Sequence, residues 1–169
     1  MPNSLLVISG SMGSGKTSVL GEASDVLTAN GIVHAAIDLD AIGAAHLPPG
    51  AADHVRCRNL AAICMNYAAE GVAKFLLAGA IEDAQDLERI RLAAQADAVI
   101  VVRLSARLDT MEKRIRTRET GLHQSFFVAR VAELEAILDR AHLERTTISN
   151  DGRSITEVAR ELLTGAGWL

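Results

Sequence analysis

The chain has 169 residues, of which 49% are hydrophobic and 22% are charged, a composition typical of a folded globular protein and not of a disordered one. Its formal net charge of -4 argues against binding of nucleic acid or of an anionic membrane, because both carry negative charge. The length suits one domain spanning residues 1–169. The sequence lacks both a secretion signal and the roughly 18 consecutive apolar residues of a membrane span, so we expect a cytoplasmic protein.

Strands and helices are predicted to alternate along the chain. Short apolar runs predict strands at residues 5–9, 32–39, 74–78, 98–104 and 146–149. Apolar residues at helical spacing predict helices at residues 15–29, 53–70, 82–95, 106–119, 125–144 and 155–163. A loop is expected at residues 43–53, around Pro48 and Gly50, and Asp53 is expected to cap the helix that follows. This alternation favours an α/β fold with a parallel sheet covered on both faces.

The two cysteines, Cys57 and Cys64, lie on one predicted helix. At about 1.5 Å of rise per residue, their separation along the helix axis is about 10 Å. A disulfide tolerates Cα separations up to roughly 7 Å. We therefore expect two buried thiols.

The segment GSMGSGKT, which runs from Gly10 to Thr17, matches the phosphate-binding pattern G-x-x-x-x-G-K-[ST] at every fixed position. It lies between a predicted strand and a predicted helix, which is the context that this loop requires. Glycines allow backbone N–H groups to turn inward around an anion, and the helix adds its positive dipole end. The alternative is a glycine-rich turn without a ligand. We predict a nucleotide site made of Gly10, Ser11, Met12, Gly13, Ser14, Gly15, Lys16, Thr17 and Ser18.

Within this loop, Lys16 is expected to contact the outer phosphates of ATP, and the Thr17 hydroxyl to ligate Mg²⁺. The chain has no Asn-Lys-x-Asp motif of a GTPase, no strand ending in Asp-Glu as in a motor ATPase, and no Leu-Ser-Gly-Gly signature of a transporter. These absences leave the small-molecule kinases among P-loop proteins.

Three further features accompany the loop: Asp38-Leu39-Asp40 at the end of the second strand, the arginine-rich segment RLSARLDTMEKRIRTRETG after the fourth, and the closing segment ISNDGRSITEVARELL. With the P-loop, they make the chain similar to the P-loop small-molecule and nucleoside kinases, a group that includes shikimate, gluconate, adenylyl-sulfate and chloramphenicol kinases. This resemblance implies a three-layer P-loop fold, with a five-stranded parallel sheet in the order 2-3-1-4-5 and a lid.

The resemblance also implies roles for the two aspartates. Asp38 would help to hold Mg²⁺ together with Thr17, and Asp40 would contact the acceptor hydroxyl as the candidate base. The alternation of side chains along a strand would place both carboxylates on one face, near the carboxyl end where open α/β sheets bind ligands. The alternative is that either residue caps the next turn, because Asp is common in turns.

Arginines dominate the segment before Gly121, where Arg103, Arg107, Arg114, Arg116 and Arg118 form a basic cluster with Lys113. By resemblance, Arg114 would pack against adenine and Arg118 would reach the transferred phosphoryl group, where a guanidinium stabilises negative charge. The alternative is a solvated helix whose arginines pair with Glu112 and Glu119. The lid, at about residues 119–127, is short and lacks the additional arginines of longer lids.

Further candidates lie elsewhere. Kinases of this group contact the adenine edge at the turn after the fifth strand, which here is Asn150-Asp151-Gly152, and a plain turn is the alternative. His46 and Arg56 lie where acceptor-binding residues often occur in such kinases. Phe126 and Phe127 are expected to pack in the lid or the core, and Trp168 is expected to anchor the C-terminus.

The sequence thus predicts an ATP- and Mg²⁺-dependent phosphotransferase that moves the γ-phosphoryl group to a small hydroxyl- or phosphate-bearing acceptor, as a monomer or a homodimer. Catalytic roles fall to Lys16, Asp40 and Arg118. The alternative, supported by the short lid, is a nucleotide-binding regulatory module without phosphotransfer activity.

Overall fold

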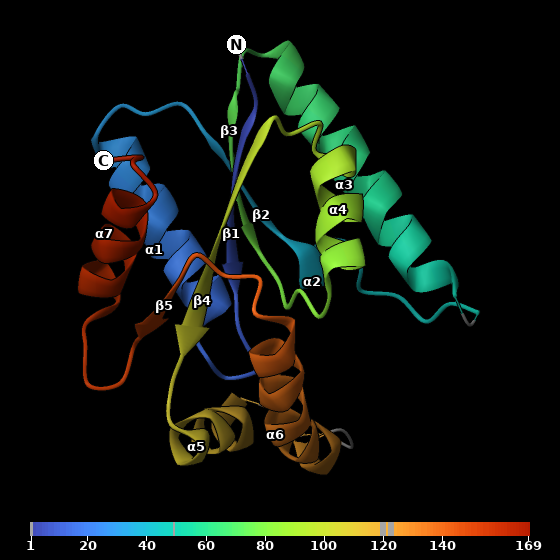
Figure 1. The fold of residues 1–169 in the computed structure, drawn as a ribbon, viewed down its shortest axis with the longest axis vertical. Helices are drawn as coiled ribbons and strands as arrows, with labels where there is room; N and C mark the ends of the chain where they lie inside the picture. Colours follow the sequence, from blue (N-terminus) through green and yellow to red (C-terminus); the bar gives the residue numbers. More distant parts are fainter. Residues whose placement is uncertain (1, 49, 119–120, 122–123) are drawn as a thin grey trace.

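The computed structural model describes residues 2–48, 50–118, 121 and 124–169. Strands and helices alternate over this part of the chain (Figure 1). The strands are β1 (Ser4–Ser9), β2 (Ala35–Asp38), β3 (Lys74–Ala78), β4 (Ala98–Ser105) and β5 (Thr146–Ser149). The helices are α1 (Lys16–Ala29), α2 (Leu39–Ile42), α3 (Ala51–Ala69), α4 (Ala84–Ala93), α5 (Leu108–Arg118), α6 (Gln124–Ala141) and α7 (Ile155–Gly165).

The five strands form one parallel sheet in the order β2-β3-β1-β4-β5, so the predicted topology is confirmed. Figure 1 shows α1 and α7 on one face of this sheet and α3 and α4 on the other. Alternate residues of each central strand enter opposite cores, as Leu6 and Ile8 of β1 pack with α1 and α7 while Leu5 and Val7 pack with α3 and α4. The result is the three-layer arrangement that buried parallel strands require.

Helices α5 and α6 lie beyond the carboxyl end of the sheet, where the arrow of β4 points toward α5 in Figure 1. They pack on each other through a small apolar cluster that contains Met111, Ile115 and Val131. This pair stands next to the edge where α/β sheets bind ligands. Trp168 anchors the C-terminal segment in the core beside α1 and α7, as expected, and the Lys74 ammonium lies 4.7 Å from its ring centroid.

Two predicted boundaries around β2 were wrong. The strand begins at Ala35 instead of residue 32, because the Ile32 N–H donates to the Leu27 carbonyl and closes the end of α1. It ends at Asp38, because the Asp38 side chain accepts hydrogen bonds from the next backbone N–H groups and starts α2. The connection from α1 to β2 is therefore longer, and β2 is shorter, than the apolar pattern indicates.

The start of α3 also differs from the prediction. Gly50 occupies the N-cap position with a φ of 80°, and the helix begins at Ala51, so the predicted cap Asp53 lies in the first turn instead. Glycine adopts this left-handed conformation without strain and ends the loop earlier than expected. Cys64 of this helix is buried, as predicted, but Cys57 is only half-buried, and both are free thiols. No helix within the described residues is both long enough and apolar enough to cross a membrane.

Candidate nucleotide and phosphoryl-transfer site

The loop between β1 and α1 has the backbone that an anion site needs. Gly10, Gly13 and Gly15 have φ values of 147°, 75° and 96°, which glycine adopts far more readily than other residues. A Cβ atom at Gly13 would stand 2.6 Å from the Met111 carbonyl oxygen, so α5 also excludes a side chain there. No side chain caps the N-terminus of α1, so its first backbone N–H groups are available as donors to an anion.

Lys16 is positioned by its own loop. Its Nζ donates to the Ser11 carbonyl oxygen at 3.1 Å. Burial lowers the pKa of Lys16, while the neighbouring carboxylates of Asp40 and Asp38 oppose this shift. The ammonium thus stands among carboxylates in a partly desolvated place, where its attraction for an anion is stronger than in open water.

Asp38 connects the P-loop to α2. Its Oδ2 accepts a hydrogen bond from the Thr17 hydroxyl at 2.8 Å, and its Oδ1 accepts from the backbone N–H groups of Asp40 at 2.9 Å and Ala41 at 3.4 Å. The capping alternative for Asp38 is therefore realised, and the same carboxylate also contacts the Thr17 side chain. A hydroxyl beside a carboxylate is a donor set that suits Mg²⁺.

Asp40 lies at the P-loop as predicted, but it belongs to a different element from the one predicted. The expectation that Asp38 and Asp40 share one face of a strand was wrong, because β2 ends at Asp38 and Asp40 belongs to α2. The turn nevertheless brings Asp40 to the P-loop, where it lines a small cavity of about 80 Å³. That cavity is lined by Met12, Gly13, Gly15, Lys16, Thr17, Ser18, Asp40 and Arg118.

The structure thus brings together several of the predicted residues and leaves others outside this cavity. Lys16, Asp40 and Arg118 meet there, although they come from three different helices. Gly10, Ser11 and Ser14 do not line it: both serines are buried behind the loop, and the Ser11 hydroxyl donates to the Val131 carbonyl of α6 at 3.2 Å. The Ser14 hydroxyl is buried and has no hydrogen-bond partner among the described residues.

Arg114 and Asn150 brace the P-loop through hydrogen bonds. The Arg114 guanidinium donates to the Gly13 carbonyl at 3.0 Å and to Asn150 Oδ1 at 3.1 Å, and Asn150 Nδ2 donates to the Ser14 carbonyl. Beside them is a cleft of about 230 Å³, lined by Gly15, Ser18, Val19, Arg114, Asn150, Arg153, Ile155 and Val158. The predicted adenine contacts, Arg114 and the turn at Asn150, therefore lie at one cleft next to the P-loop.

The predicted basic cluster is divided by its ion pairs. Arg103 is buried and binds Glu135 at 2.9 Å and Asp139 at 2.6 Å, so it ties β4 to α6 and lines neither of the two cavities at the P-loop. Arg107 pairs with Asp109 at 3.1 Å on the surface. Arg116 pairs with Glu112 at 3.6 Å, which confirms the solvated-helix interpretation for that residue. Only Arg114 and Arg118 of this group line the P-loop cavities described above.

The predicted lid, at about residues 119–127, falls partly on residues 119–120 and 122–123, which lie outside the described residues, as does Glu119, a predicted arginine partner. Its last part, from Gln124 to Phe127, is the first turn of α6. Phe127 packs against the cluster around Met111 and Ile115. Phe126 stacks edge-on against it and is 61% exposed.

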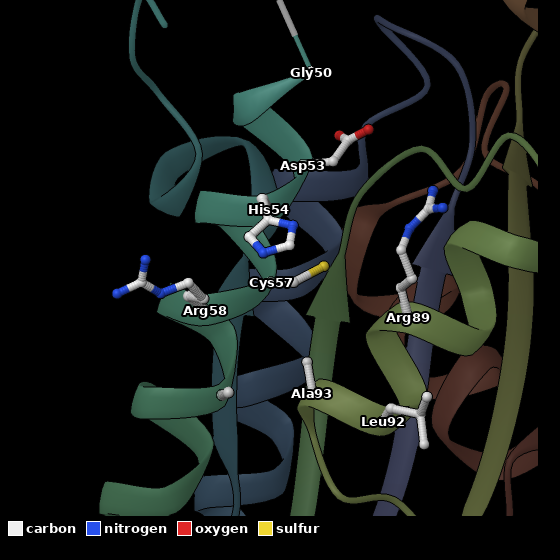
Figure 2. A pocket seen from close by; sticks show the side chains of 9 residues that line it. Gly50, Asp53, His54, Cys57, Arg58, Arg89, Leu92 and Ala93 are labelled. Atoms are coloured by element: carbon white, nitrogen blue, oxygen red, sulfur yellow. The ribbon is translucent and has the colours of Figure 1, made fainter. Parts of the chain in front are cut away.

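A larger cleft, of about 620 Å³, lies between α3 and α4 (Figure 2). In this view the charged ends of Asp53 and Arg89 lie toward the Gly50 end of the cleft, while Leu92 and Ala93 lie at the other end. It shares no lining residue with the P-loop cavity and contains none of the predicted site residues. Of the predicted acceptor contacts, His46 is exposed, and Arg56 pairs with Asp86 at 3.0 Å and Asp53 at 3.2 Å.

No protein-family model and no curated protein matches this sequence. Solved structures do match its fold. A sugar kinase from Janibacter sp. HTCC2649 superposes with a TM-score of 0.66 at 16% identity, covering 99% of this chain and 95% of that one. The shikimate kinase of Acinetobacter baumannii in complex with shikimate superposes with a TM-score of 0.62 at 21% identity, over 98% and 93% of the two chains.

A third match is the APS kinase of Mycobacterium tuberculosis in complex with AMPPNP and APS, with a TM-score of 0.62 at 20% identity over 99% of both chains. The chain has the fold of the P-loop small-molecule kinases. The predicted resemblance is therefore confirmed at the level of the fold, over nearly the whole length of the chain. At these identities the matches describe the scaffold, and the site residues of this kinase fold must be argued from their own chemistry.

Proposed function

We propose that this chain is a single-domain, cytoplasmic, ATP- and Mg²⁺-dependent phosphotransferase, monomeric or homodimeric. It would move the γ-phosphoryl group to a small hydroxyl- or phosphate-bearing acceptor. One observation carries the proposal: the Thr17 hydroxyl is held by Asp38 at 2.8 Å, beside a cavity that Lys16, Asp40 and Arg118 line together. A loop that only bound phosphate would not need a carboxylate and a guanidinium facing the same space.

The residues present suit the nucleotide and the metal. The segment from Gly10 to Ser18 supplies glycine-rich backbone and the uncapped N-terminus of α1, and Lys16 supplies a positive charge for phosphate oxygens. Thr17 and Asp38 supply oxygen ligands of the kind that Mg²⁺ prefers. ATP, when bound, would supply the γ-phosphoryl group, and ADP would leave with the electron pair of the broken bond. Mg²⁺ would offset the negative charge of the phosphates.

The remaining residues have roles in positioning and in proton transfer. The Asp40 carboxylate accepts the proton of the acceptor hydroxyl as the acceptor oxygen bonds to phosphorus. The Arg118 guanidinium stabilises the negative charge that spreads over the phosphoryl oxygens. Arg114 and Asn150 donate to the carbonyls of Gly13 and Ser14 and so help to fix the shape of the loop.

The test is the release of ADP from ATP and Mg²⁺, with and without a panel of small hydroxyl compounds. We expect at least one acceptor to raise ADP release well above the basal rate, and Asp40→Asn to lower that acceptor-dependent rate by roughly 10²- to 10⁴-fold, the usual contribution of a general base. If the chain binds ATP while no acceptor raises turnover, the nucleotide-binding module without transfer is the correct description.

A further inference from the structure

The cleft of about 230 Å³ beside the P-loop has an aliphatic part and a cationic part. Its aliphatic side chains are Val19 of α1 and Ile155 and Val158 of α7, and its charged side chains are Arg114 and Arg153. Ile155 is 39% exposed although it is a large apolar residue. Two P-loop residues line both this cleft and the P-loop cavity. A nucleotide with its phosphates at the P-loop can therefore extend its base into the cleft, against aliphatic and guanidinium surfaces.

Asn150 supplies the amide of this lining, and the protein itself uses both ends of that amide. Its Oδ1 accepts from Arg114 at 3.1 Å, and its Nδ2 donates to the Ser14 carbonyl. The amide cannot be turned over, because a guanidinium only donates hydrogen bonds and a carbonyl only accepts them. Asn150 is also only 9% exposed. Its amide is therefore committed to the loop and is not offered to a base.

The two arginines of the lining give adenine no advantage over guanine. Arg153 donates to the Ser149 carbonyl at 3.2 Å and to Glu161 at 2.5 Å, and Arg114 also donates to the Gly13 carbonyl at 3.0 Å. Any donors that these guanidinium groups still offer can meet only an acceptor on a base. Adenine carries an amino donor at the ring position where guanine carries an oxygen acceptor. The arginines therefore have no group that recognises the adenine amino group.

Two other places could supply an acceptor for that amino group. The Ser18 hydroxyl can accept, but Ser18 is in the first turn of α1 and also lines the P-loop cavity, so it lies at the phosphate end of the cleft. Neither Asp151 nor Gly152 lines the cleft. The Asp151 carboxylate instead accepts from the Arg107 backbone N–H at 2.6 Å. The described lining thus offers the base its ring-face contacts and no reading of its edge.

We infer that the nucleotide site is permissive for the base and binds ATP and GTP alike, so that either nucleotide can donate the phosphoryl group. A guanidinium stacks on any base, because every base has a π face. Strong discrimination needs polar groups that one base satisfies and another leaves unpaired. This inference rests on the proposed function and widens its phosphoryl donor. In the transfer, the acceptor oxygen bonds to the γ-phosphorus, its proton passes to Asp40, and the nucleoside diphosphate leaves with the electron pair of the broken bond.

The first test is calorimetric titration of the full chain, in Mg²⁺, with the non-hydrolysable β,γ-imido analogues of ATP and GTP. We expect the two dissociation constants to agree within about tenfold. An ATP analogue that binds more than about a hundredfold more tightly than the GTP analogue overturns the inference, whether or not the chain transfers phosphate. Equal binding without any phosphorylated product supports the permissive site and overturns the proposed transfer. Binding of neither analogue overturns both.

The second test separates the contact with the base from the support of the loop. In Arg114→Met we expect the affinity for ATP and for GTP to fall about tenfold more than the affinity for tripolyphosphate, which has no base. Arg116→Met is the matched control, because Arg116 pairs with Glu112 at 3.6 Å and lines neither cavity. Equal losses for nucleotides and tripolyphosphate, in a variant that melts at the wild-type temperature, would show that Arg114 acts on the loop alone and would overturn its contact with the base.

Discussion

Asp38 accepts hydrogen bonds from two parts of the chain, so substitutions there separate a structural role from a metal-binding one. In Asp38→Ala, α2 loses its N-cap, at a cost of about 1 kcal/mol. The Thr17 hydroxyl loses its partner, which costs about 1 kcal/mol more. Leu39, the next residue, is 1% exposed, so this turn is fixed in the core and cannot relax away from the loss. We expect Asp38→Ala to lower the free energy of unfolding by about 2 kcal/mol.

Asp38→Asn keeps the cap but removes the charge, because Asn caps helices about as well as Asp. We expect its free energy of unfolding to stay within about 0.5 kcal/mol of wild type, while the Mg²⁺ concentration needed for half-maximal ADP release rises about tenfold. Urea unfolding gives the first quantity and a Mg²⁺ titration of ADP release gives the second. Asp25→Asn, at an exposed position of α1, is the control for the loss of one surface charge.

The outcomes refute separate parts of the reasoning. A wild-type Mg²⁺ requirement in Asp38→Asn would show that this carboxylate has no part in metal binding. Unchanged stability in Asp38→Ala would show that the capping bonds contribute nothing. A loss of stability in Asp38→Asn as large as that in Asp38→Ala would mean that the charge itself holds the turn.

Three more predictions concern the scaffold. Gly13→Ala places a Cβ atom 2.6 Å from the Met111 carbonyl oxygen at a φ of 75°, so we expect the variant to lose about 2 kcal/mol of stability and at least tenfold in ATP affinity. The control Gly21→Ala places its Cβ atom in open space and should be neutral or stabilising by up to about 1 kcal/mol. Equal effects of the two substitutions would contradict this prediction. Arg103→Met leaves Glu135 and Glu144 without their buried partner, so urea unfolding should show that the free energy of unfolding falls by about 3 kcal/mol. The control Arg107→Met, at an exposed pair, should lower it by less than about 0.5 kcal/mol. Similar losses in the two variants would refute this prediction. Burial raises the pKa of Cys64 to about 11, so the folded state favours the neutral thiol, and the thiol of the unfolded chain ionises at a lower pH. Between about pH 9 and about pH 11, the free energy of unfolding of wild type should therefore fall by up to about 3 kcal/mol more than that of Cys64→Ala. Parallel pH profiles of the two proteins would contradict this prediction.

The P-loop could be predicted because its pattern is local, whereas the strand order 2-3-1-4-5 was implied by the resemblance to the P-loop kinases. The pattern from Gly10 to Thr17 carries its own backbone requirement, and five apolar segments separated by helices leave few parallel arrangements. Asp40 was predicted near the P-loop for a wrong reason, because the alternation of side chains along a strand was assumed to continue over Asp38-Leu39-Asp40. A side chain that caps its own backbone ends a strand within one residue, and Asp is common both in turns and at the ends of strands.

Contacts between distant segments could not be predicted. Arg103 was grouped with the arginines that follow it, but its partners Glu135 and Asp139 lie in α6, and nothing local marks that pairing. The bond from Asn150 to the Ser14 carbonyl likewise joins the end of β5 to the P-loop. An Asn at the turn after the last strand was a signal for this position, but its direction toward the loop depends on the packing of the whole sheet.

The central claim is phosphoryl transfer, and its most direct test is detection of the phosphorylated product by mass spectrometry. The full chain is incubated with ATP, Mg²⁺ and a panel of neutral, cationic and anionic hydroxyl compounds, beside Lys16→Met, which removes the ammonium in the loop. We predict that wild type adds a phosphoryl group to at least one compound while forming one ADP per product, and that Lys16→Met does not. ATP binding by wild type without any phosphorylated product would contradict the claim.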